Sequence, residues 1–155
     1  MLQLCSDVLT CLAGKTLATA ESCPGGMIGA ALTAVPGASS VYRGGIISYT
    51  NEVKHSVLGV SYDLLDTCGA VSAPVAEAMA AGARKALSSD VAVSVTGLAG
   101  PGGDEFGHTI GTVFLGLANE YRSLSKEYHF SGDREAVRRQ AAEEALKLVL
   151  EYWNQ

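Results

Sequence analysis

The sequence predicts an α/β protein, a three-layer α/β/α sandwich with a mixed, mostly parallel sheet of about five strands. Two observations lead to this prediction. Apolar residues at helical spacing alternate with short β-prone runs along most of the chain, which is typical of helices packed on both faces of a sheet. Late in the chain, residues 109–117 and 122–130 are two strand-like runs joined by a turn at Asn119-Glu120. This hairpin adds antiparallel pairing, so the sheet is expected to be mixed.

The predicted elements follow from local signals. Capping residues, glycine breaks and proline–glycine pairs delimit the helices, and short apolar runs mark the strands. The expected helices are 2–12, 25–34, 51–58, 61–68, 72–87 and 133–153, and the expected strands are 16–20, 41–49, 90–96, 109–117 and 122–130. Gly44-Gly45 indicates a bulge or a close contact within the second strand. In the last helix, Arg138 and Arg139 are expected to face water.

The composition is typical of one folded domain, residues 1–155. The 155 residues are 48% hydrophobic and 17% charged, with a net charge of −5, so a broad basic surface for nucleic acid is not expected. No apolar run approaches ~18 residues and no basic segment precedes the first apolar residues, so neither a membrane span nor a signal peptide is expected. The four cysteines lack zinc-like spacing and the three histidines are scattered. These features favour a cytoplasmic protein with reduced thiols and no metal.

The turn at residues 19–26 joins a β-prone run to a helical run. Pro24 suits a first helical position, and Gly25 and Gly26 allow another group close to the backbone. Free N–H groups at a helix start, together with the helix dipole, favour a phosphate or an oxyanion. Ser22, at the mouth of this turn, is therefore either a nucleophile beside an anion hole or an ordinary N-cap serine.

A second signal lies at positions 48–54. If Asn51 caps a short helix, Lys54 lies one turn on and can point back toward Tyr49. A partly buried lysine has a lowered pKa and can accept a serine proton, directly or through the tyrosine hydroxyl. The alternative is a solvated helix lysine beside an ordinary strand tyrosine.

A glycine-rich loop at 97–103 follows a predicted strand. It lacks the Walker and dinucleotide-binding motifs, but such a backbone can form a nest for a phosphate, or it can simply close a hairpin. The candidate positions are Gly97, Ala99, Gly100 and Gly102. Since this loop and the turn at 19–26 both follow strands, we expect them to meet at one edge of the sheet.

Each of three further sites has two interpretations, one as a catalytic or binding group and one as an ordinary structural residue. Cys23 is a rival nucleophile, but strand alternation sends it and Ser22 to opposite sides, and its apolar character suits the packed side. Asp104-Glu105 is most simply a solvated turn. Arg134 is most simply part of a helix start, although it can reach a phosphate.

Several segments, in this order, resemble the CinA C-terminal domain family, the nicotinamide-nucleotide amidohydrolases also called NMN deamidases. The segments are Thr19–Gly26, Gly45–Lys54, 69–72, Val95–Gly103, 111–113 and Phe130–Arg139. The resemblance covers essentially the whole chain. Longer members of the family carry an additional N-terminal domain, so this chain is expected to be similar to the stand-alone form.

The resemblance implies hydrolysis of the carboxamide of nicotinamide mononucleotide to nicotinate mononucleotide and ammonia, with no cofactor or metal. It implies that Ser22 is the nucleophile, helped by Tyr49 and Lys54. Residues 23–26 would supply oxyanion donors, and the loop 97–103 would help to hold the nucleotide. These roles fit the chemistry, because amide hydrolysis needs a nucleophile, a base and preorganised N–H donors.

One departure from the family pattern leaves alternatives open. Pro24 stands where the family usually has threonine, and proline offers neither a hydroxyl nor a backbone N–H. The segment 104–109 also differs from the family. The alternatives are a catalytically weak nucleotide- or partner-binding module linked to competence and recombination, and a serine amidase for another small amide. A homo-oligomer, most simply a dimer, is expected in each case.

Overall fold

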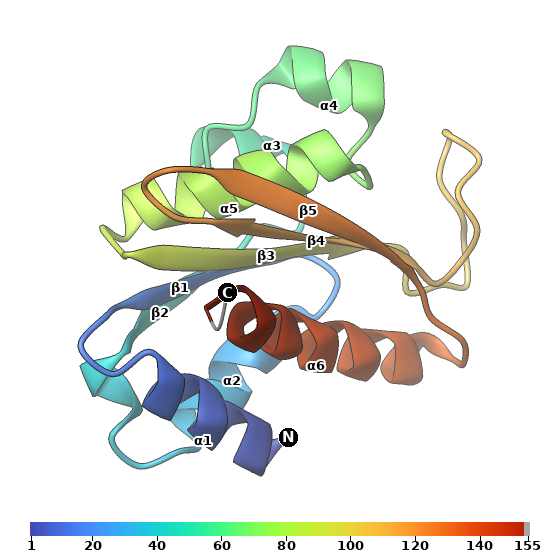
Figure 1. The fold of residues 1–155 in the computed structure, drawn as a ribbon. Helices are drawn as coiled ribbons and strands as arrows, with labels where there is room; N and C mark the ends of the chain where they lie inside the picture. The colour runs from blue at the N-terminus through green and yellow to red at the C-terminus, as the bar shows by residue number, and fades with distance from the viewer. Residues whose placement is uncertain (154–155) are drawn as a thin grey trace.

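The computed structural model describes residues 1–153, in which five strands form one sheet in the order β2-β1-β3-β4-β5 (Figure 1). The strands are β1 (Leu17–Glu21), β2 (Tyr42–Ile47), β3 (Val91–Gly97), β4 (Thr112–Ala118) and β5 (Ser123–His129). Strand β1 pairs in parallel with β2 and β3, whereas β4 is antiparallel to β3 and β5. Only β4 therefore runs against the others among the described strands, which confirms the mixed, mostly parallel sheet.

Helices cover both faces of this sheet, as the three-layer prediction requires. One face carries α1 (Leu2–Cys11), α2 (Met27–Thr33) and α6 (Arg134–Trp153) (Figure 1). The other face carries α3 (Asn51–Ser56), α4 (Tyr62–Cys68) and α5 (Ala73–Ala86). A short 3-10 helix, η1 (Ala38–Ser40), lies between α2 and β2.

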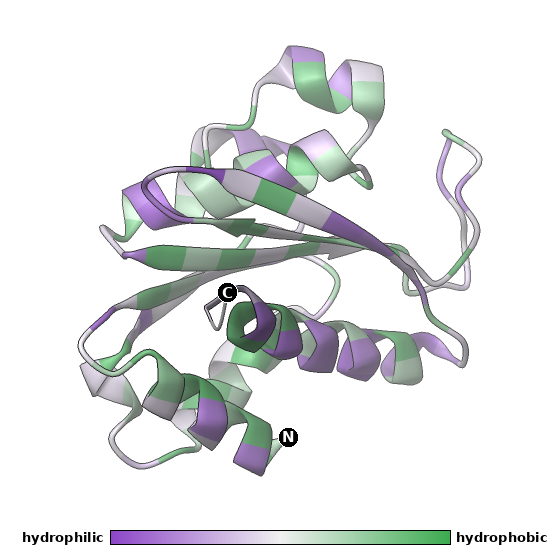
Figure 2. Cartoon of the chain, in the orientation of Figure 1, coloured by the Kyte–Doolittle hydropathy of each residue, from purple (hydrophilic) through white to green (hydrophobic). Residues whose placement is uncertain are grey.

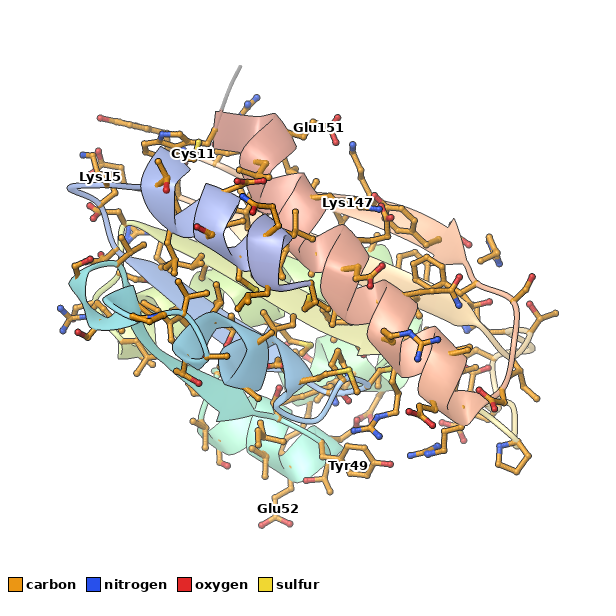
Figure 3. The ribbon with its side chains drawn as sticks, turned by 90° about the horizontal axis from the view of Figure 1, so that it is seen from below. Cys11, Lys15, Tyr49, Glu52, Lys147 and Glu151 are labelled. Carbon is orange, nitrogen blue, oxygen red and sulfur yellow. The ribbon has the colours of Figure 1, made fainter. Side chains whose placement is uncertain are left out.

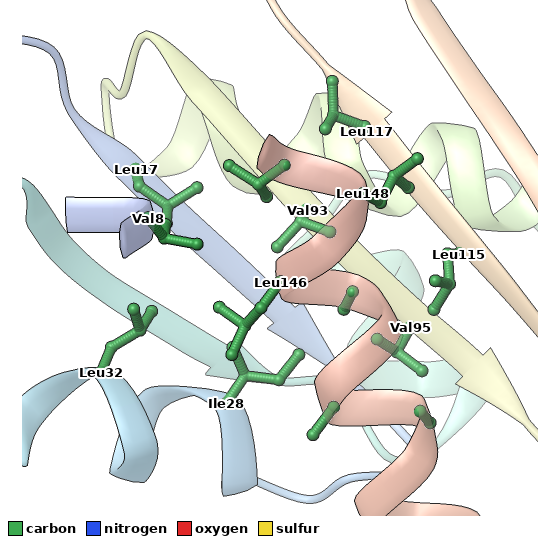
Figure 4. Packing of buried hydrophobic residues seen from close by; sticks show 14 of the residues in the cluster. Val8, Leu17, Ile28, Leu32, Val93, Val95, Leu115, Leu117, Leu146 and Leu148 are labelled. Carbon is green, nitrogen blue, oxygen red and sulfur yellow. The ribbon is translucent and has the colours of Figure 1, made fainter. Parts of the chain in front are cut away.

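The central strands are buried and the edge strands are half-exposed. Every residue of β1 and β4 is buried, whereas exposed positions recur along β2 and β5, and hydrophobic residues gather along the central strands in Figure 2. The larger core lies between the sheet and α1, α2 and α6 (Figure 4). A smaller core lies under α5. Within residues 1–153, no helix combines the length and the apolar character that crossing a membrane demands.

The strand register brings three chain segments to one edge of the sheet. Glu21 at the end of β1 pairs with Ile47 of β2 and with Val95 of β3. The residues that follow these strands therefore leave the sheet side by side. The predicted bulge in β2 is confirmed, since Arg43 is an extra residue that interrupts the register.

Among the element boundaries that differ from the prediction, two bear on the site. Helix α2 begins at Met27 rather than Gly25, because residues 22–26 form a separate turn in which Gly25 and Gly26 have φ of +62° and +104°. Such positive φ values are incompatible with the first turn of a helix. The loop before β4 continues to residue 111, so it is longer than the sequence indicated and stands out from the sheet (Figure 1).

Candidate active site

A cavity of about 360 Å³ lies at the carboxyl ends of β1, β2 and β3. This volume is in the range of small-molecule sites. The predicted site residues that line it are Ser22, Cys23, Tyr49, Lys54, Gly97, Ala99 and Arg134. The turn and the glycine-rich loop therefore meet at one edge of the sheet, as expected. The remaining candidates, Gly25, Gly26, Gly100 and Gly102, lie outside the cavity lining.

The structure brings Ser22 and Lys54 together. Ser22 is held in place by its N–H, which donates to the carbonyl of Val95 at 2.9 Å. The Lys54 side chain is 1% exposed, and its Nζ donates to Ser22 Oγ at 3.3 Å. Nζ also donates to the carbonyl of Ser48 at 2.8 Å, so the ammonium nitrogen is fixed beside the serine hydroxyl.

Helix α3 places Lys54 in this position. Its N-cap is Thr50 rather than the predicted Asn51, and Thr50 Oγ1 accepts the N–H of Val53 at 3.3 Å. Lys54 then lies one turn into the helix and reaches back under the end of β2. Burial lowers the pKa of Lys54 from 10.5 to about 8, because desolvation disfavours its charged form. A substantial neutral fraction is therefore present near physiological pH.

Tyr49 lies at the mouth of the cavity rather than between Ser22 and Lys54. Its side chain is 59% exposed and points outward (Figure 3). Its hydroxyl accepts a hydrogen bond from Arg134 Nη2 at 3.2 Å, and Lys54 contacts only the Tyr49 backbone carbonyl, at 3.4 Å. Lys54 thus contacts Ser22 directly, which is one of the two expected routes, and the other route, through the tyrosine hydroxyl, is not formed.

The amides of Gly25 and Gly26, which were expected to hold an anion, are already occupied. The N–H of Gly25 donates to the Ser22 carbonyl at 3.1 Å, and the N–H of Gly26 donates to Glu21 Oε1 at 3.2 Å. The Glu21 carboxylate also accepts the N–H groups of Ile28 and Gly29, at 2.8 and 3.0 Å. The prediction that this helix start is free for a substrate anion is therefore wrong, because a buried side chain of the protein itself fills it.

Cys23 is a weaker nucleophile candidate than Ser22. Burial raises the pKa of its thiol, and the guanidinium groups of Arg138 and Arg134 offset this only in part, so the unreactive thiol form prevails at neutral pH. Arg138 was expected to face water, but its Nε donates to the Cys23 carbonyl at 3.1 Å. Its Nη2 donates to the Pro24 carbonyl at 2.9 Å, so α6 braces the turn.

Sequence reasoning missed several residues of this site. Glu21 carried a faint signal, as a lone charge at the end of an apolar strand. Thr96, Asp104, Glu105 and Phe106 also line the cavity. Within residues 1–153, no group of three or more histidine, cysteine or acidic side chains is placed to hold a metal ion.

The chain is similar to a known protein family. The model of the CinA C-terminal domain matches residues 3–153. The chain belongs to the CinA C-terminal domain family. It is 49% identical over 125 residues to a CinA-like protein of Geobacter metallireducens, which covers 81% of this chain and 30% of that protein. It is 44% identical over 133 residues to a CinA-like protein of Thermotoga neapolitana, which covers 86% of this chain and 32% of the relative.

The chain therefore spans about a third of the length of these CinA-like relatives. Solved structures of the family have the same fold. A competence-damaged protein (CinA) superfamily protein from Escherichia coli has a TM-score of 0.95 at 34% identity, covering 98% of this chain and 90% of that one. The competence/damage inducible protein CihA from Agrobacterium tumefaciens has a TM-score of 0.93 at 37% identity, covering 99% and 95%.

Proposed function

We propose that this chain hydrolyses the carboxamide of nicotinamide mononucleotide to nicotinate mononucleotide and ammonia. The observation that carries this proposal is the buried Lys54 ammonium nitrogen, which lies 3.3 Å from Ser22 Oγ in a ligand-sized cavity. A hydroxyl beside an amine of lowered pKa is a nucleophile beside its base. The resemblance to NMN deamidases supplies the substrate, and membership of the CinA family supports it.

The proposed reaction has two steps. Neutral Lys54 accepts the Ser22 proton while Oγ forms a bond to the amide carbon. The protonated Lys54 returns a proton to the amide nitrogen as the tetrahedral intermediate collapses. The C–N bond breaks and ammonia departs, so that Ser22 carries the acyl group as an ester. Water, deprotonated by Lys54, then attacks the ester carbon. The bond between this carbon and Ser22 Oγ breaks, Lys54 returns its proton to Oγ, and the carboxylic acid leaves as a carboxylate with its proton passing to solvent.

Other residues of the cavity would hold the substrate. The N–H of Cys23 has no acceptor within residues 1–153, so it is available to the developing oxyanion. At the mouth, Arg134 Nη2 and the Tyr49 hydroxyl lie 3.2 Å apart, and both can donate to a phosphate. Arg134 Nη1 also holds the carbonyl of Gly100 at 2.7 Å, which ties the glycine-rich loop to α6. Pro24 does not line the cavity. A threonine hydroxyl at this position, as is usual in the family, is therefore not needed to contact the substrate.

The direct test is ammonia release from nicotinamide mononucleotide by the purified chain. The Ser22→Ala variant should lower kcat by at least ~10³-fold, because the nucleophile is lost. Its matched control is Cys23→Ala, the same truncation one residue along, which should keep kcat within about threefold if the neighbouring thiol plays no part in the chemistry.

Three results would change the proposal. Loss of activity in Cys23→Ala with retention in Ser22→Ala would reassign the nucleophile. Tight nucleotide binding by calorimetry without turnover would favour the binding module. Release of ammonia from other small amides, but not from the nucleotide, would favour a different amidase.

A further inference from the structure

Three consecutive residues of the long loop form one wall of the cavity. Asp104, Glu105 and Phe106 all line it, together with Ser22 and Lys54. The sequence suggested a solvated turn at Asp104-Glu105. Two carboxylates are unusual neighbours for a nucleotide, because they repel its phosphate. Their presence calls for a positively charged part of the ligand.

Hydrogen bonds fix this segment. Asp104 Oδ1 accepts the N–H of Phe106 at 3.2 Å and the N–H of His108 at 2.9 Å, and Oδ2 contacts His108 Nδ1 at 2.6 Å. Burial raises the pKa of Asp104, but the hydrogen bonds from the ring and backbone of His108 outweigh burial, and the pKa lies below its usual value. Asp104 is therefore an anion at neutral pH, in a fixed position.

The ring of Phe106 packs against the backbone of Gly69. A Cβ on Gly69 would lie 2.6 Å from Cδ2 and 2.7 Å from Cε2 of Phe106, so the ring rests where Gly69 has no side chain. The Phe106 side chain nevertheless stays 41% exposed. Together with Tyr49, it presents an aromatic ring at the cavity mouth.

A ligand cation is stabilised by aromatic faces and by carboxylates, and the gain is larger where water is excluded. The other charged groups of the cavity are basic: Lys54 at its base and Arg134 at its mouth. The wall of Asp104, Glu105 and Phe106 is thus the part of the cavity that suits positive charge.

We infer that the segment Asp104–Phe106 selects a positively charged planar ring, an N-alkylated pyridinium carboxamide, over the same ligand with an uncharged ring. This inference rests on the proposed function, since it assumes that the carboxamide lies against Ser22. Phe106 supplies the aromatic face and Glu105 supplies the compensating charge, whereas Asp104, with both oxygens engaged within the loop, fixes the position of the segment.

The test measures binding rather than turnover. In the Ser22→Ala background, calorimetry compares nicotinamide mononucleotide with its reduced form, which has the same phosphate, ribose and amide but an uncharged dihydropyridine ring. The oxidised form should bind about two- to thirtyfold more tightly. Phe106→Leu should remove most of this preference, and Glu105→Gln should lower the ratio of the two affinities.

Glu52→Gln is the matched control for Glu105→Gln. Glu52 is an exposed carboxylate on α3 that does not line the cavity (Figure 3), so its loss should change neither affinity. Equal affinity for the two ligand forms, equal weakening of both by Phe106→Leu, or no binding of either form would overturn the inference. The proposed function fails separately, if the unmutated chain releases no ammonia.

Discussion

Burial changes the chemistry that Lys54 can perform. Its spacing alone favours a solvated helix lysine. In the structure, no carboxylate within residues 1–153 pairs with it, and its nitrogen is held by Ser22 Oγ and by the carbonyls of Ser48 and Tyr49. An ammonium group without a counter-ion is costly to bury, and this cost favours the neutral amine.

The pKa of Lys54 predicts the pH dependence of ammonia release. A base must be deprotonated, so activity should rise with pH and level off above the pKa of about 8. Well below that pH, kcat/KM should fall about tenfold per unit. Steady-state rates between pH 6 and 9.5 measure this limb.

The Lys54→Arg variant is the control for charge. It keeps a cation but cannot lose its proton, so it should be inactive at every pH. A flat profile for the unmutated chain would rule out Lys54 as the base.

At the scale of elements, Glu21 joins β1 to α2. It is the last residue of β1 and is 2% exposed, and its carboxylate accepts the N–H groups of Gly26, Ile28 and Gly29. These are orphan donors of the helix start and of the turn before it. Because Ser22 follows Glu21 directly, the same contacts fix the direction in which the serine leaves the strand.

Glu21→Gln should both destabilise the fold and slow the reaction. The amide NH₂ would face N–H groups that need an acceptor, at a cost of about 1–3 kcal/mol in the free energy of unfolding. Urea denaturation measures this loss, and kcat should fall because the Ser22 turn loosens.

Glu52→Gln removes a charge from the first turn of α3 at an exposed position, and should change stability by less than about 0.5 kcal/mol. If Glu21→Gln were as stable and as active as this control, Glu21 would not hold the turn.

At the scale of the whole molecule, close approach between layers depends on glycine. A Cβ on Gly116 of β4 would collide with the carbonyl of Ala76 in α5. That carbonyl also accepts a hydrogen bond from Ser94 Oγ of β3, at 2.5 Å. Helix α5 therefore lies directly on the backbone of the sheet, and this contact sets how far α5 stands from the strands that end at the cavity.

Gly116→Ala should force these layers apart. Overpacking of this kind costs about 1–3 kcal/mol in the free energy of unfolding, which a urea midpoint will show. The control is Gly102→Ala, since a Cβ at Gly102 would meet no atom within 4 Å. Similar midpoints for the two variants would show that the layer spacing is not fixed at Gly116.

The sequence predicted the fold class, the order of helices and strands, the late hairpin and the meeting of two glycine-rich segments at one sheet edge. These features follow from periodicity and from turn residues, which act over a few positions along the chain. The match to the CinA C-terminal domain model covers residues 3–153, a range that includes the segments on which the resemblance was based.

Only the tertiary structure decided what surrounds each candidate group. It buried Lys54 against Ser22, 32 positions away, and brought Arg138 to the turn carbonyl of Cys23, 115 positions away. It also filled the helix start with Glu21 and seated Phe106 on Gly69. Desolvation and hydrogen bonding between distant segments set the charge and position of these groups, and no local pattern encodes which distant segment arrives.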